Sequence, residues 1–210
     1  MELLFNALIT LLVVIDPVGV AATFGAMTAE LPRRERARIA RKGVWIAAGI
    51  LYFFALTGNA FINAIGITLP AFRIAGGILL FFLAIDMILV RQSGMHAATK
   101  PEQAELGHRK DIAVFPVAIP LIAGPGAITS VLLHMGTAWP TTWTAIGLLG
   151  VIALALIVTF AMLRLAGPVM DLLGVTGTHV VGRVLGILLA ALAVQFVLDG
   201  VRAAGLLPHS

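Results

Sequence analysis

Six long runs of apolar residues, separated by short polar segments, dominate the chain. A helix needs about 20 apolar residues to cross the core of a bilayer, and each run reaches that length. Each run is apolar around its whole circumference, without the 3.6-residue stripe of a surface helix, which is typical of a membrane span. The pattern therefore predicts an all-α integral membrane protein with six spans, at residues 3–24, 43–65, 69–90, 112–135, 142–165 and 180–201.

The first run raises the alternative of a secretory signal peptide. Met1 and Glu2 supply no basic region before it, and the run has full span length with Asp16-Pro17 inside it. A signal peptide has a basic start and a shorter apolar stretch. We therefore expect this run to be retained as the first span.

The two halves of the chain carry an internal repeat. A shift of 108 residues pairs Pro17 with Pro125, and one inserted residue later Gly77 and the three residues after it match Gly186 and its followers. Each half holds three spans, an odd number, so the second half must enter the membrane from the opposite side. This predicts one membrane domain over 1–210: repeat one (about 1–91), a cytoplasmic linker (about 92–111) and repeat two (about 112–205). Inverted repeats of this kind recur among secondary transporters.

Composition agrees with a membrane protein and excludes several other classes. The chain is 60% hydrophobic and 11% charged, with a mean hydropathy of +1.05, which argues against a water-soluble enzyme or a nucleic-acid-binding module. It has no cysteine, and its five histidines form no HxxxH or HExxH pattern, so we expect no metal site and no cofactor. A GxxxxGK[ST] motif is also missing from the sequence, so direct use of ATP is not expected.

Basic residues predict the orientation of the spans. The loops after spans one, three and five, all on one side of the membrane, hold twelve of the 14 lysines and arginines, and only Arg73 and Arg202 remain for the other side. Cytoplasmic loops carry the excess of basic residues. We therefore expect both termini to be extracytoplasmic.

The centres of spans one and four contain helix-breaking sequences. Proline inside a helix removes one amide donor and clashes with the carbonyl four residues earlier. Asp is also a favoured N-cap and proline a favoured first helical residue, which predicts new half-helices over about 17–27 and 125–135. Because the repeats are inverted, the two half-helix N-termini are expected to face each other near the midplane and to bind an anionic group such as a carboxylate. The substrate-binding residues predicted there are Asp16, Pro17, Val18, Gly19, Gly124, Pro125, Gly126, Ala127 and Thr129.

Asp16 is the sole ionisable residue predicted near the middle of a span. A charged side chain at that depth costs a few kcal/mol, so it is read as functional by default. It can cap the half-helix, bind a substrate ammonium group or carry a coupling proton, and the sequence leaves these roles open. Further polar positions are candidates for the pathway, namely Thr23, Asp86 and Ser130.

The motif residues resemble those of the MarC family. The resemblance rests on Asp-Pro-Val-Gly at 16–19 and on Phe-Pro-Val-Ala-Ile-Pro-Leu-Ile-Ala-Gly-Pro-Gly-Ala-Ile-Thr at 115–129, and it covers essentially the whole chain. It implies a multi-pass protein of the bacterial inner membrane. In the SnatA-type branch of the family it implies transport of small neutral amino acids such as glycine and alanine.

Three classes of function follow from the residues and the resemblance. The favoured one is a secondary transporter of a small zwitterion, with H⁺ or Na⁺ as a coupling ion and the lipid bilayer, not nucleic acid, as its surroundings. The second is a non-transporting stress-related or accessory membrane protein. The third is an intramembrane enzyme with Asp16 and Asp86 as a carboxylate pair, which is disfavoured because the two acids are expected at different depths. The sequence leaves the substrate, the direction of transport and the oligomeric state open.

Overall fold

The computed structural model describes residues 2–89, 112–138 and 142–205, and the regular structure in these ranges is entirely helical. The expectation of an all-α protein is therefore confirmed for this part of the chain. The expected linker at 92–111 lies outside it. The elements are α1 (Glu2–Ile15), α2 (Pro17–Met27), α3 (Arg33–Ala64), α4 (Leu69–Leu89), the irregular helical segment η1 (Ala113–Ile122), α6 (Pro125–Ala138), α7 (Thr142–Arg164) and α8 (Ala166–Ala203).

Five stretches are long and apolar enough to cross a membrane, and the bent pair η1–α6 makes a sixth. α1 and α2 together form one such stretch of 26 residues. α3 extends well beyond its predicted span, because it begins at Arg33 rather than near residue 43. α8 begins at Ala166, but its helical backbone is interrupted at Gly174 (φ 60°, ψ −176°), and the stretch long and apolar enough to cross a membrane is Thr176–Ala203, close to the predicted span at 180–201. Hydropathy marks only the part of a helix that lies in hydrocarbon, whereas the helix itself continues into polar sequence.

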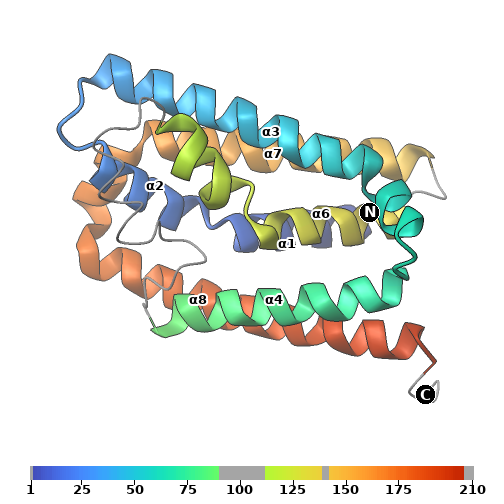
Figure 1. The fold of residues 1–210 in the computed structure, drawn as a ribbon. Coiled ribbons are helices and arrows are strands. Elements are labelled where there is room, and N and C mark those ends of the chain that lie inside the picture. The colour runs from blue at the N-terminus through green and yellow to red at the C-terminus, as the bar shows by residue number, and fades with distance from the viewer. Residues whose placement is uncertain (1, 90–111, 139–141, 206–210) are drawn as a thin grey trace.

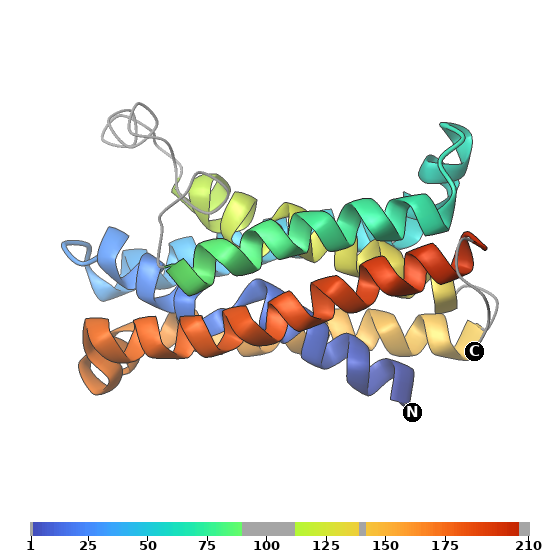
Figure 2. The same cartoon turned by 90° about the horizontal axis from the view of Figure 1, so that it is seen from below.

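The helices are arranged in three layers (Figure 1). α3 and α7 form one outer layer, α4 and α8 form the other, and α1, α2 and α6 lie between them, whereas η1 packs mainly on α3. Seen from below, α4 and α8 cross the whole molecule in front of the middle layer (Figure 2). The two outer pairs thus cover much of the central layer, although side chains of α1 such as Phe5 and Ile9 remain exposed.

Glycines allow the close approach of α4 and α8. A Cβ atom at Gly77 would lie 2.7 Å from the carbonyl oxygen of Ala193, and one at Gly200 would lie 3.0 Å from the carbonyl oxygen of Pro70. Towards the other end of the pair, a Cβ atom at Gly186 would lie 3.0 Å from that of Met87. The order of these contacts shows that the two helices run antiparallel.

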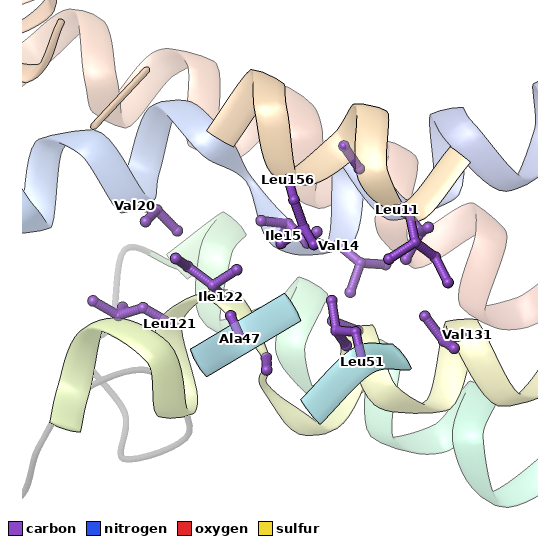
Figure 3. Close-up of a cluster of buried hydrophobic side chains, with 14 of the residues drawn as sticks. Leu11, Val14, Ile15, Val20, Ala47, Leu51, Leu121, Ile122, Val131 and Leu156 are labelled. Atoms are coloured by element: carbon purple, nitrogen blue, oxygen red, sulfur yellow. The ribbon is translucent and has the colours of Figure 1, made fainter. Parts of the chain in front are cut away.

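The apolar core lies where the middle layer meets α3 and α7. Leu11, Val14 and Ile15 of α1 lie in one cluster with Leu51 of α3 and Leu156 of α7 (Figure 3). A hydrogen bond from the Tyr52 hydroxyl to the Leu149 carbonyl, 2.9 Å long, links α3 to α7 directly. Large apolar side chains elsewhere face outward, as a lipid-exposed surface requires, among them Phe5, Trp45, Phe53, Phe61, Trp143 and Ile187.

The start of α1 and the end of α8 lie at the same end of the bundle (Figures 1 and 2). A chain with an even number of membrane spans has both of its ends on the same side of the membrane. The first turns of α3 and the last residue of α7 lie at the opposite end, which gathers a group of basic side chains: Arg33, Arg34, Arg36, Arg38, Arg41, Lys42 and Arg164.

Candidate functional site

Asp16 separates α1 from α2 with a single left-handed residue. Its backbone angles are φ 50° and ψ 69°, a conformation that Asp and Asn tolerate better than most other residues. The Gly19 amide donates a 3.0 Å hydrogen bond to Oδ1 of Asp16, which makes Asp16 the N-cap of α2. Pro17 occupies the first turn of α2, where its missing amide proton is not needed.

The Asp16 carboxylate therefore lies over the N-terminus of α2. Oδ2 comes so close to Gly19 that a Cβ atom at that position would collide with it. The backbone ladder is nearly continuous here, because the Asp16 amide donates to the Leu12 carbonyl and the Val20 amide donates to the Asp16 carbonyl, at 3.0 and 2.9 Å. The protein thus supplies its own anion to this helix end.

The second interruption, between η1 and α6, is much sharper. The two segments are bent by 53°. Phe115 and Ile119 adopt extended backbone angles inside η1, each directly before a proline, as the restriction on pre-proline residues favours. Gly124 is buried at the bend, and a Cβ atom there would lie 2.5 Å from the Pro120 carbonyl oxygen. Only glycine fits this position without a shift of the backbone.

The first turn of α6 packs against the last turn of α1. A Cβ atom at Gly126 would lie 2.9 Å from Cγ1 of Val14, two residues before Asp16, and 3.0 to 3.1 Å from the side chains of Leu80 and Leu83. Figure 3 places Ile122, at the end of η1, in the same cluster as Val14. The segments around Asp16 and Gly124 are therefore neighbours in the middle layer.

The other predicted site residues differ in their surroundings. Ala127, Thr129 and Ser130 are buried, Val18 is half-buried, and Pro125 is exposed. Thr129 packs its methyl group against Gly76 of α4.

The Ser130 hydroxyl is buried and has no hydrogen-bond partner in the described part of the chain. Thr23 is exposed on α2 and Asp86 half-buried on α4. Neither of them lines the cavities described next, so the structure does not gather all predicted pathway residues in one place.

Two cavities lie beside α6, one at its first turns and one at Leu133 and His134 in its later half. One of about 330 Å³ is almost wholly apolar and includes Pro125 and Thr129 in its wall, with Phe54, Phe61 and Phe72 opposite. The other, of about 560 Å³, lies between α1, α4, α6 and α8 and is lined by many polar side chains. It contains residues that the sequence did not single out as a site, namely Glu2, Arg73, Gln195 and Asp199. For Glu2, Arg73 and Asp199 a charge near a predicted span end was the only signal, and for Gln195 it was a polar side chain inside the sixth predicted span.

Comparison with known proteins identifies the family. The model of the MarC family of integral membrane proteins matches residues 1–204. The UPF0056 membrane protein MJ1677 of Methanocaldococcus jannaschii is 36% identical, over 91% of this chain and 92% of that protein. A UPF0056 membrane protein of Aquifex aeolicus is 36% identical, over 99% and 95% of the two chains. The UPF0056 membrane protein YhcE of Escherichia coli is 33% identical, over 94% and 91%.

No solved structure matches the chain. The family model and these relatives agree with each other, and they cover nearly all of the helices described above. They also agree with the resemblance carried by the Asp-Pro and Gly-Pro segments. The chain belongs to the MarC family of integral membrane proteins.

Proposed function

We propose that the protein is a secondary transporter of small neutral amino acids, of the size of glycine or alanine, and not an enzyme. It works without a bound cofactor and uses a gradient of H⁺ or Na⁺. Its place is the bacterial inner membrane, with both termini outside. The observation that carries the proposal is the contact between two helix interruptions in the middle layer.

The pairing of helices supports an inverted repeat. In the proposed repeat, α1–α2, α3 and α4 correspond to η1–α6, α7 and α8. The corresponding spans α3 and α7 pack against each other, as do α4 and α8, and in the two broken spans the first half of one, α1, packs on the second half of the other, α6. Each of these pairs runs antiparallel in Figure 1, as a two-fold axis in the membrane plane requires. Transporters built this way bind substrate near the bilayer midplane, where discontinuous helices meet.

The N-terminus of α6 is the better place for the substrate carboxylate. At α2 the Asp16 carboxylate already accepts the Gly19 amide proton. At α6 the corresponding residue is Gly124, which has no side chain to cap the helix. A helix N-terminus without an anionic cap attracts an anion through its unpaired amides and its dipole. We therefore place the substrate carboxylate at residues 124–127 and its ammonium group toward Asp16.

The crowding around α6 favours a small substrate. Gly126 leaves no room for even a methyl group between Val14, Leu80 and Leu83. A ligand held at this helix end has a tightly packed apolar wall beside it. In our proposal Thr129 contributes to the site one turn further on, and Thr23, Asp86 and Ser130 to the pathway.

Uptake by the purified protein in liposomes tests the proposal. We expect labelled glycine and alanine to accumulate in protein-containing vesicles when a proton or sodium gradient is imposed. Asp16→Asn keeps a side-chain oxygen that can cap α2 but loses the negative charge. A charge-assisted hydrogen bond contributes about 1.5–3 kcal/mol, so apparent affinity should fall about ten- to a hundredfold.

Glu30→Gln is the matched control, because it removes an exposed carboxylate in the turn between α2 and α3. It should leave uptake unchanged. No uptake by the wild-type protein under either gradient would favour the accessory role and remove the transport proposal. Normal uptake by Asp16→Asn would reduce Asp16 to a helix cap.

A further inference from the structure

The polar cavity of about 560 Å³ lies at the end of the bundle that holds the start of α1 and the end of α8. Four helices wall it, and they come from both halves of the chain. Apart from apolar residues, its lining consists of Glu2, Asn6, Thr10, Arg73, His134, Gln195 and Asp199. So many polar side chains are unusual between helices whose other faces meet lipid.

Acidic and basic side chains both line this cavity. Gly200 of α8 packs against Ile74 of α4, where a Cβ atom would lie 3.1 Å from the Ile74 amide nitrogen. Asp199 and Arg73, their neighbours in sequence, therefore lie at the same level of the bundle. Asp199 accepts a 2.8 Å hydrogen bond from Gln195 and lies 3.9 Å from Arg202.

Arg73 differs from Asp199 in having no such partner. Among the described residues, no hydrogen bond or ion pair engages its guanidinium group. A guanidinium presents five donors in a planar fork that matches the two oxygens of a carboxylate. Within the described part of the chain, the cavity thus holds an unpaired guanidinium, and its wall also contains a carboxylate that Gln195 already holds in place.

Two rows of polar side chains lead from the cavity toward the interruptions. On α1, Asn6 and Thr10 precede Val14 by two turns and one turn. On α6, His134 and Ser130 follow Gly126 at the same spacing. Residues four apart lie on one face of a helix, so each row follows one line. The contact between Val14 and Gly126 brings the inner ends of both lines together.

Ser130 is the buried member of the polar row on α6. Its backbone carbonyl lies 2.7 Å from Nδ1 of His134, which lines the cavity. Its hydroxyl is fully buried and has no partner among the described residues. Buried hydroxyls in proteins are normally hydrogen-bonded, so this one is available to a ligand or to water.

We propose that this cavity is an outer binding site for a small zwitterion, separate from the site at the helix interruptions. Arg73 binds the carboxylate, and Asp199 with Glu2 binds the ammonium group. The hydroxyls of Thr10 and Ser130 then lead the molecule toward the N-terminus of α6. The proposal rests on the proposed transport function for its substrate, but binding in the cavity is testable without transport.

The chain has no cysteine, so one introduced thiol reports on one position. Asn6→Cys places the thiol in the cavity wall, and Val194→Cys places it on an exposed apolar position of α8 outside that wall. We expect a membrane-impermeant thiol reagent, added from the side of the termini, to label Asn6→Cys and not Val194→Cys. Labelling that is equal at both positions, or absent at Asn6→Cys, would overturn the cavity as an open site.

Protection from labelling tests the ligand. Saturating glycine should slow the labelling of Asn6→Cys at least about fivefold, while acetate and methylamine, which each carry one of its charges, should protect less. In the double variant Asn6→Cys/Arg73→Gln, glycine should no longer protect the thiol, because the glycine carboxylate loses the guanidinium that can donate two parallel hydrogen bonds to it. Adding Arg183→Gln, which removes an exposed arginine elsewhere on α8, should preserve protection.

The outcomes separate this proposal from the transport proposal. Uptake of glycine without protection of Asn6→Cys would support the proposed transport function and overturn the outer binding site. Protection of Asn6→Cys without uptake would support the outer site and overturn the transport function. Protection that is equal for acetate and glycine, or that survives Arg73→Gln, would overturn the recognition of a zwitterion by Arg73.

Discussion

At the scale of single residues, Asp16 shows how one side chain changes the chemistry of a helix end. The sequence predicts it as an N-cap before Pro17, and the structure has it capping α2 through the Gly19 amide. Its left-handed backbone is not visible in the sequence. Because its carboxylate stays on its own helix, α2 and α6 present different ends to a ligand, one already capped by an anion and one formed by glycine.

The left-handed conformation predicts an order of stability among variants at position 16. Asp16→Asn should stay within about 0.5 kcal/mol of wild type, since Asn caps helices and tolerates this conformation. Asp16→Ala loses a cap worth about 1 kcal/mol and adds a backbone cost of about 1–2 kcal/mol. Thermal unfolding in detergent should therefore rank Asn above Ala.

Asp16→Gly separates the two costs. It loses the cap but adopts the left-handed conformation freely, so its apparent Tm should exceed that of Asp16→Ala. Equal Tm values for the glycine and alanine variants would show that the backbone conformation at position 16 carries no cost.

At the scale of elements, the contact between α4 and α8 depends on where glycines face. In lipid, helices associate by close packing of small residues rather than by a hydrophobic driving force. Gly77, Gly186 and Gly200 all lie at the contact, whereas Gly49 on α3 has open space where a Cβ atom would be. Composition alone does not distinguish these glycines.

Two glycine-to-alanine variants test this contact. Gly77→Ala should lower the apparent Tm, because the new methyl group would lie 2.7 Å from the backbone oxygen of Ala193 and the helices would have to separate. Gly49→Ala should keep or raise it, since alanine favours a helix by about 1 kcal/mol over glycine. A Tm that falls equally in both variants would contradict the role of the α4–α8 contact.

At the scale of the whole molecule, the three layers place the interruptions away from lipid. The outer pairs α3–α7 and α4–α8 cover the middle layer, so irregular backbone at Asp16 and at residues 123–124 is surrounded by protein. Irregular backbone at membrane depth is tolerated only in such surroundings or beside a water-filled cavity. The layers are therefore a condition for any binding chemistry at the interruptions.

The proposed orientation predicts the behaviour of reporter fusions. The end of α8 and the turn between α2 and α3 lie at opposite ends of the bundle. A reporter fused after Gly205 should be active as an extracytoplasmic fusion, and one inserted at Glu30 as a cytoplasmic one, because the basic residues gather at the latter end. A cytoplasmic signal after Gly205 would invert the orientation, and signals on the same side at both positions would contradict the bundle itself.

The sequence by itself determined the helical membrane class, the approximate spans, the start of α2 at Pro17 and the family motifs. These depend on local properties, because hydropathy is an average over neighbouring residues and capping acts within one turn. Only the tertiary structure placed Arg73 and Asp199 in the wall of one cavity, packed Gly126 against Val14 and buried the Ser130 hydroxyl without a partner among the described residues. Such contacts depend on the rotation and register of each helix against its neighbours, and side-chain packing between distant segments sets both.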